Sequence, residues 1–228
     1  MTFSLVVHDP DTGHVGVAAM TAMPGVGKLV AHARAQHGAA ASQAMVNPYL
    51  AFDGLELLQQ GMSAQDALAK VVEADPGREG RQFSLVDARG GSASFTGELP
   101  EDWKGHRTGL HFSCQGNRLV GPEVIDQAVA AYHELRGEPL IDRLISGLEA
   151  GEDAGGDTMG HRSATVVIMG TELYPLWDIR IDESDDPLAE VKDRKAVFAE
   201  DLLPEILMLP TRDDPLGGFD YEGHEGAV

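Results

Sequence analysis

Side-chain amides stand at two places where the sequence predicts that β-strands end. Gln43 and Asn47 follow a run of very small residues, and Gln115 and Asn117 flank Gly116 after an apolar segment. An amide N–H aimed at a carbonyl under attack stabilises the negative oxygen that develops there, which is usually the largest contribution in acyl transfer. The pattern indicates Asn117 as an oxyanion donor, although asparagine beside glycine is also typical of a turn or a cap.

A third polar group follows the glycine pair 155–156 and contains Asp157, His161 and Arg162. Glycines let a backbone approach a ligand closely, but an ordinary loop between a helix and a strand explains the same residues. Asp157 and His161 are the one pair worth considering as metal ligands, and no His-Glu-x-x-His or similar spacing accompanies them. We expect Asp157 and Arg162 to contact substrate, with no metal and no cofactor.

Two further reactive side chains have conventional explanations. Cys114 lies inside an apolar strand, as a small buried hydrophobic residue does. It is the sole cysteine, so no internal disulfide can form, which fits a reducing compartment. His106, between Gly105 and Arg107, is expected to shape a loop rather than to act as a base.

The charge argues against two classes of partner. The 228 residues include 17 Lys or Arg and 37 Asp or Glu, for a formal net charge of −20. That field repels nucleic-acid phosphates and anionic lipids, although acidity also serves solubility or salt adaptation. The sequence has no apolar run of roughly 20 residues and no basic segment at its start. We expect a cytoplasmic protein with no nucleic-acid and no membrane partner.

A β-hairpin is expected at the N-terminus. Residues 2–7 and 15–21 are rich in β-formers and flank the turn Asp9-Pro-Asp-Thr-Gly13. Partners in an antiparallel pair have residue numbers of constant sum, so Thr2 should lie opposite Thr21. Two hydroxyl groups would then face each other at the open end of the hairpin.

The remaining periodicities predict an α+β chain. Helices are expected over residues 50–60, 64–72, 122–135, 139–148 and 187–207, and strands over 38–43, 82–86, 92–96, 110–115, 165–169 and 176–181. Antiparallel strands interrupted by helix pairs suit two sheets packed face to face with helices outside, a four-layer αββα sandwich. One domain is expected over residues 1–210, and residues 211–228, with five acids, are expected to form a flexible acidic tail.

Short strings spread over residues 2–185 resemble a known family. They are Thr2-Phe-Ser-Leu-Val-Val7, Asp9-Pro-Asp-Thr-Gly13, Gly16-Val-Ala18, Ser42-Gln-Ala-Met-Val-Asn-Pro48, Gly54-Leu-Glu-Leu-Leu58, Arg81-Gln82, Ala93-Ser-Phe-Thr-Gly97, Gly105-His-Arg107, Gln115-Gly-Asn117, Gly121-Pro122, Ala154-Gly-Gly-Asp157 and Arg162-Ser-Ala164. The chain resembles the family called domain of unknown function 1028, within the N-terminal-nucleophile (Ntn) hydrolase superfamily. The resemblance implies an αββα sandwich of the Ntn-hydrolase type.

In that superfamily the first strand opens with Thr, Ser or Cys, whose side chain attacks an amide while its free α-amine acts as base. Thr2 follows only Met1, and a small second residue is the usual condition for removal of the initiator methionine. Thr2 is thus the nucleophile candidate, and a plain β-branched strand residue is the alternative. Proteasome-like relatives add an Asp and a Lys as helpers, whereas here Thr21 faces Thr2 and only Arg34 and His37 lie near the third strand.

The expected function is hydrolysis of a linear amide or peptide bond, in a homo-oligomer, by Thr2 as nucleophile and Asn117 as oxyanion donor. The residues expected to bind the small-molecule or peptide substrate are Thr21, Gln43, Asn47, Gln115, Asp157 and Arg162. Gln43, Gln115, Asn117 and Asp157 are further expected to converge on one cleft. The alternative is a non-catalytic ligand-binding or assembly protein that retains the fold. Thr2 favours the enzyme, and the missing Asp and Lys helpers favour the alternative.

Overall fold

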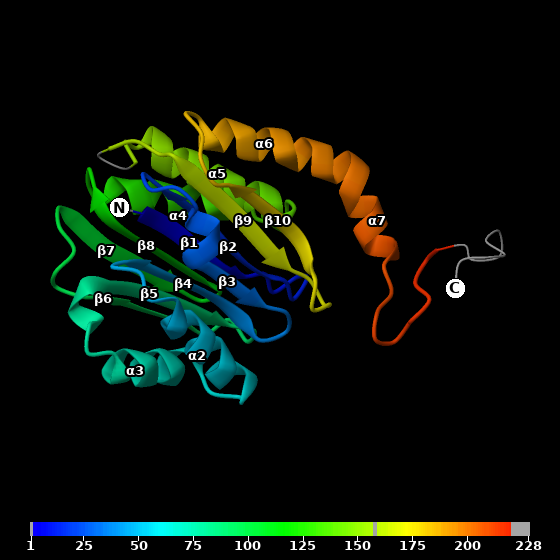
Figure 1. Cartoon of the computed structure of the whole chain (residues 1–228), viewed down its shortest axis with the longest axis horizontal. Helices are drawn as coiled ribbons and strands as arrows, with labels where there is room; N and C mark the ends of the chain where they lie inside the picture. Colours follow the sequence, from blue (N-terminus) through cyan, green and yellow to red (C-terminus); the bar gives the residue numbers. More distant parts are fainter. Residues whose placement is uncertain (1, 157–158, 220–228) are drawn as a thin grey trace.

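The computed structural model describes residues 2–156 and 159–219, and its framework is two antiparallel sheets (Figure 1). The larger sheet has the order β10-β9-β2-β1-β8-β7, with β1 (Thr2–His8), β2 (Val15–Thr21), β7 (Trp103–Gly109), β8 (Phe112–Leu119), β9 (Ser163–Met169) and β10 (Pro175–Ile181). The smaller sheet has the order β3-β4-β5-β6, with β3 (Ala31–Arg34), β4 (Gly38–Ala44), β5 (Arg81–Asp87) and β6 (Ser92–Thr96). The expected α+β class with antiparallel sheets is confirmed.

β1 lies between β2 and β8, and all seven of its residues are buried. Successive side chains of a strand point to opposite faces, so Phe3 and Leu5 enter one core while Val6 enters another. The register with β2 pairs Thr2 with Thr21. The hairpin predicted from the turn is therefore confirmed.

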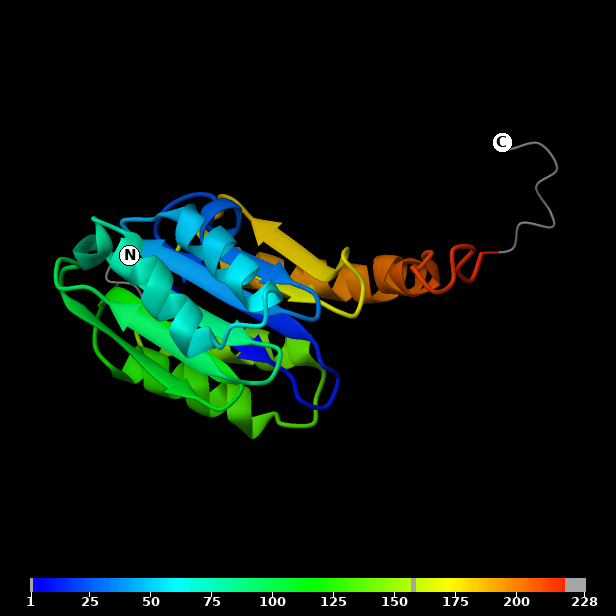
Figure 2. The same cartoon turned by 90° about the horizontal axis from the view of Figure 1, so that it is seen from below.

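Helices cover one face of each sheet (Figures 1 and 2). The helices are α2 (Pro48–Gln59) and α3 (Ala64–Ala74) against the smaller sheet, and α4 (Glu123–Glu134), α5 (Leu140–Asp153) and α6 (Pro187–Val197) against the larger. The caps match their sequences: Ser63 accepts a hydrogen bond from the Asp66 backbone N–H at the start of α3. A third core lies between the sheets, where the small side chains of Ala39 and Ala41 meet Val6 and Val17.

Two edge strands lie where no strand was predicted. β3, with the short helix α1 (Val26–Leu29) before it, occupies part of residues 24–36. β7 occupies the segment of Trp103 and His106, for which the sequence predicted a loop. Both strands lie at sheet edges and are mostly half-exposed or exposed. β3 has only four residues and β7 has a single large apolar residue, so neither gives a strong strand pattern.

The C-terminal helix expected over residues 187–207 is divided into three parts. α6 is followed by a π-helical turn, η2 (Phe198–Leu202), and by α7 (Leu203–Met208), which extends beyond the sheets (Figure 2). Half of the expected tail, residues 220–228, lies outside the described residues. Within the described ranges, no helix is long and apolar enough to cross a membrane.

Candidate functional site

The two hydroxyls expected at the open end of the hairpin meet there. Thr2 Oγ1 donates a hydrogen bond of 3.1 Å to Thr21 Oγ1, and only 5% and 3% of the two residues are exposed. On its other side Thr2 pairs with Asn117 of β8. Thr2 therefore lies between two of the other residues that the sequence indicated.

A network of side-chain amides lies beside Thr2, and Gln82 of β5 is its hub. Gln82 Oε1 accepts hydrogen bonds from Asn117 Nδ2 at 2.9 Å and from Gln43 Nε2 at 3.0 Å. Gln82 Nε2 donates to the Gly116 carbonyl at 2.7 Å. The three amide side chains come from both sheets and are at most 1% exposed, so the network joins the sheets by fully buried hydrogen bonds.

The network also holds the main chain of Thr2. Its carbonyl accepts a hydrogen bond of 3.0 Å from Gln43 Nε2 and a longer contact of 3.5 Å from Asn117 Nδ2. Ser4 fixes the other end of the Gln43 amide by donating to its Oε1 at 2.7 Å. At 3.5 Å the Asn117 contact is weak, so this second N–H of Asn117 is the one that another acceptor could take.

Gln115 lies on the same face of β8, two residues before Asn117. Its Nε2 donates to the Ala41 carbonyl of β4 at 3.0 Å, while its Oε1 is buried without a hydrogen-bond partner among the described residues. An unpaired buried acceptor costs about 1–3 kcal/mol. Gln115 thus lies between the sheets rather than at an open surface.

A pocket of about 250 Å³ opens next to this network. Asn117 lines it together with Met45, Leu99, Glu101 and Arg118. The Arg118 Nε is buried without a hydrogen bond among the described residues, although it lies 3.9 Å from the Asp102 carboxylate, and Arg118 Nη2 lies 3.7 Å from Glu101. The pocket combines apolar walls with an arginine N–H that makes no hydrogen bond among the described residues, as a small polar ligand would need.

Three of the expected substrate contacts lie elsewhere or cannot be placed. Asn47 caps α2 by accepting from the Tyr49 N–H at 3.2 Å, which accounts for its position after the strand. The Arg162 side chain makes a two-pronged ion pair with Glu183, at 2.9 and 2.7 Å, although its backbone N–H reaches the Thr21 carbonyl. Asp157 lies outside the described residues.

No Asp or Lys helper stands beside the Thr2 side chain among the described residues. In the described part of the chain, no carboxylate or ammonium group contacts the Thr2 side chain. Lys28 instead forms a surface ion pair of 2.6 Å with Asp182. Nor do the described residues contain a group of three or more His, Cys, Asp or Glu that could hold a metal ion.

Cys114 shows the role expected of it, whereas His106 lies in strand β7 instead of in the expected loop. Cys114 is buried in the core beneath α4 and α5, and burial raises the pKa of its thiol, so it stays protonated. Burial lowers the pKa of His106, whose Nδ1 lies 2.9 Å from Thr96 Oγ1, so its ring is neutral near pH 7. The protonated thiol of Cys114 is not prepared for nucleophilic attack, and Thr96 Oγ1 occupies one ring nitrogen of His106.

Sequence reasoning missed two buried residues near this end of the larger sheet. Gln82 is the first residue of the predicted strand 82–86. Its contact with Gln43 follows only once β5 is paired with β4, because that pairing places the two residues opposite each other. His161 was weighed only as a metal partner. Its Nδ1 lies 3.0 Å from Glu152 Oε1, its ring packs edge-on against Phe3, and its Nε2 has no hydrogen-bond partner among the described residues.

The model of one family, described as "Family of unknown function (DUF1028)", matches residues 2–191. The chain belongs to this family. A crystal structure of the DUF1028 protein SPO2555 from Silicibacter pomeroyi is 28% identical, with a TM-score of 0.87, covering 96% of this chain and 99% of that chain. Anbu (ancestral beta-subunit) from Yersinia bercovieri is 13% identical, with a TM-score of 0.44, covering 92% and 98%. No curated protein matches this DUF1028 chain.

Proposed function

We propose that this DUF1028 protein is an N-terminal-nucleophile amidohydrolase that cleaves a linear amide or peptide bond, with Thr2 as nucleophile. The observation that carries the proposal is the position of Thr2. It opens the central strand, its hydroxyl is oriented by Thr21, and its carbonyl is held by Gln43. A nucleophile must be fixed in this way before it can meet a substrate carbonyl.

The proposed chemistry needs a free α-amine. While Met1 is attached, the nitrogen of Thr2 is an amide and has no basicity. Removal of Met1 creates an amine with a pKa of about 7.7–8.0, which can take the hydroxyl proton as Oγ1 bonds to the substrate carbonyl carbon. The amine then passes that proton to the departing amine, and water hydrolyses the resulting ester. The weakly engaged N–H of Asn117 would donate to the oxyanion.

The substrate would enter through the pocket that Asn117 lines. Its volume of about 250 Å³ suits a short acyl or peptidyl group. The buried Nε of Arg118 would supply a donor to a polar atom of that group. We therefore propose a small-molecule or peptide substrate whose carbonyl side carries a hydrogen-bond acceptor.

We also propose that the two sheets and their helices form the four layers of an Ntn-type sandwich. The three separate cores, one between the sheets and one beneath each set of helices, support an αββα sandwich of the Ntn-hydrolase type. In such a sandwich the residue that opens the first strand lies between the layers, as Thr2 does.

A non-catalytic binding or assembly protein is the second candidate. It is favoured by one specific observation, namely that the hydroxyl of Thr2 meets another hydroxyl instead of an acid or an amine. Thr2 is also only 5% exposed while Met1 precedes it. On this reading the amide network serves only to join the two sheets.

The deciding experiment starts with the intact mass of the protein purified from its native cell, which shows whether Met1 is retained. The processed protein is then exposed to a peptidyl epoxyketone, which needs both the hydroxyl and the free amine of an N-terminal threonine to form its cyclic adduct. We expect a mass increase equal to the whole probe, which Thr2→Ala abolishes and Thr2→Ser preserves. Thr108→Ala, which changes an exposed strand threonine, is the matched control and should react normally.

Two results would contradict the proposed amidohydrolase activity of Thr2. Retained Met1 in the native protein removes the base. An adduct that persists in Thr2→Ala places the reaction elsewhere. Thr2→Ala is expected to fold, because a single hydroxyl hydrogen bond contributes about 0.5–1.5 kcal/mol.

A further inference from the structure

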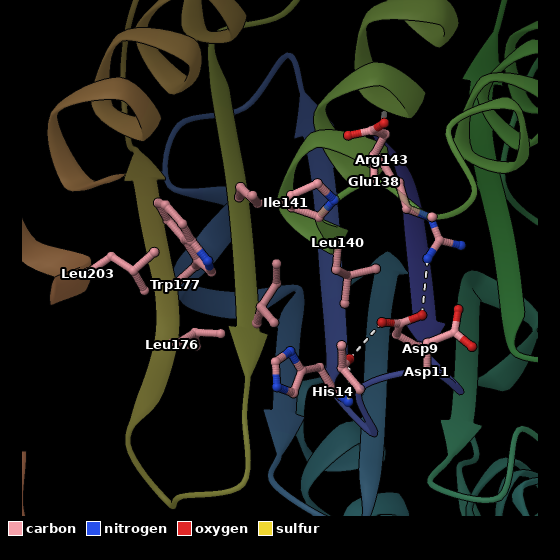
Figure 3. Close-up of a pocket in the computed structure, with 14 residues that line it drawn as sticks. Asp9, Asp11, His14, Glu138, Leu140, Ile141, Arg143, Leu176, Trp177 and Leu203 are labelled. Atoms are coloured by element: carbon pink, nitrogen blue, oxygen red, sulfur yellow. Dashed lines mark hydrogen bonds and ion pairs between the residues drawn. The ribbon is translucent and has the colours of Figure 1, made fainter. Parts of the chain in front are cut away.

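A second pocket, of about 400 Å³, lies at the other end of β1 (Figure 3). Its walls are mainly apolar and consist of Leu140, Ile141, Ile168, Leu176, Trp177 and Leu203. Asp9 lines it just after β1, seven residues beyond Thr2. At about 3.3 Å per residue this separates the pocket from Thr2 by about 23 Å, so it is distinct from the candidate site.

Four separate parts of the chain build this pocket. They are the β1–β2 turn, the loop between α4 and α5 with the start of α5, the neighbouring strands β9 and β10, and helix α7. Figure 3 shows Leu176, Trp177 and Leu203 on one side and the acidic turn on the opposite side. Leu203 of α7 lies beyond the family match, which ends at residue 191. One wall is thus supplied by the C-terminal helices that extend from the body.

One carboxylate in the pocket is already neutralised. Asp9 and Arg143 form a buried ion pair of 3.1 Å, with only 7% and 6% of their side chains exposed. Thr12 donates a second hydrogen bond to Asp9, at 2.6 Å. Arg143 also lies over the ring of Tyr132, 4.3 Å from its centroid. The arginine is therefore fully engaged and is not free to receive an anionic ligand.

The remaining charge at the rim is negative. Asp11, in the β1–β2 turn, and Glu138, in the loop between α4 and α5, are exposed carboxylates of the pocket wall. His14 does not offset them, because burial lowers its pKa and leaves the ring neutral near pH 7. The rim therefore carries two net negative charges around an apolar interior.

We propose that this pocket binds an organic cation with an apolar body, of the alkylamine or arylalkylamine class. The ammonium group would lie between Asp11 and Glu138, and the apolar body would pack against Trp177, Leu176 and Leu203. Burial of apolar surface supplies most of the affinity, and the two carboxylates select the sign of the charge. The pocket volume, about 400 Å³, holds a ligand of this size.

The test compares three probes of one shape and different charge: 4-phenylbutylamine, 4-phenylbutanol and 4-phenylbutyrate. Binding is followed by calorimetry and by fluorescence of Trp177 in a Trp103→Phe background, because the chain has only these two tryptophans. We expect the amine to bind at least about fivefold more tightly than the alcohol, and we expect the acid to bind most weakly. The preference for the amine should shrink as salt is raised.

Two variants locate the effect. Asp11→Asn with Glu138→Gln should weaken amine binding about fivefold and leave alcohol binding unchanged. Leu203→Ala should weaken both. Glu73→Gln, which changes an exposed carboxylate on α3 in the other helical layer, is the matched control and should change neither.

Three outcomes would overturn the proposal. The first is an alcohol that binds as tightly as the amine. The second is an amine affinity that the double variant leaves unchanged. The third is the absence of any calorimetric or fluorescence response to the amine at millimolar concentration in the wild-type protein.

Discussion

Replacing Gln82 by methionine tests whether the amide network is what holds the two sheets together around Thr2. Methionine fills nearly the same volume but offers no strong donor or acceptor. The change leaves one N–H of Gln43, one N–H of Asn117 and the carbonyl of Gly116 without the hydrogen bonds that Gln82 makes.

The expected loss follows from these three groups. Gln43 and Asn117 are at most 1% exposed, so water cannot replace the lost partner. Each unsatisfied buried group costs about 1–3 kcal/mol, and with some relaxation Gln82→Met should lower the free energy of unfolding by about 3–6 kcal/mol. Such a loss is a large fraction of the roughly 5–15 kcal/mol by which folded proteins are stable.

Gln115→Met is the matched control, because it makes the same chemical change on β8 of the facing sheet. Gln115 makes one side-chain hydrogen bond, to Ala41, and its Oε1 already lacks a partner among the described residues. Losing the bond and removing the unpaired oxygen nearly offset each other, so the cost should be about 0–1.5 kcal/mol.

Urea unfolding followed by circular dichroism gives both free energies, with the slope m reporting whether the unfolded states are comparable. Gln82→Met should have the lower midpoint by a wide margin. If the two variants differ by less than about 1 kcal/mol, the reasoning from unsatisfied partners is wrong, and the network does not carry the stability assigned to it.

Two other predictions concern the end of the molecule opposite Thr2. Burial and the neighbouring His111 lower the pKa of His8, so the unfolded chain binds a proton at this histidine more readily than the folded chain does. The neutral His8 therefore stabilises the fold fully above about pH 6.5, and this stabilisation is lost as the pH falls through the folded-state pKa. Urea unfolding at pH 7.5 and 5.5 should show a loss that His8→Asn reduces, and an undiminished loss in the variant would exclude His8 as its source. Arg143→Met should cost about 3–5 kcal/mol by leaving Asp9 buried without its cation, and adding Asp9→Asn should recover part of that cost. If Arg143→Met alone unfolds at the wild-type urea midpoint, the buried carboxylate of Asp9 does not need the arginine as its partner.

Much of the fold could be predicted because its information is local. The turn at residues 9–13 sets the β1–β2 register by counting alone, and it correctly placed Thr2 opposite Thr21. The helices α2 to α5 follow from apolar spacing and from caps such as Ser63. The strands β3 and β7 were not predicted, because β3 has only four residues and β7 has a single large apolar residue.

The candidate site was predicted only in part, for a related reason. The sequence by itself determined that hydroxyl and amide side chains stand at the ends of β1, β2, β4 and β8, since strand ends follow from local patterns. Only the tertiary structure decided which of them meet. Gln82 becomes the hub because β5 lies beside β4 and faces β8 across the space between the sheets, whereas Asn47 turns away to cap α2. The pairing of one sheet against the other depends on how both helical layers and all three cores pack, and no short stretch of sequence contains that information.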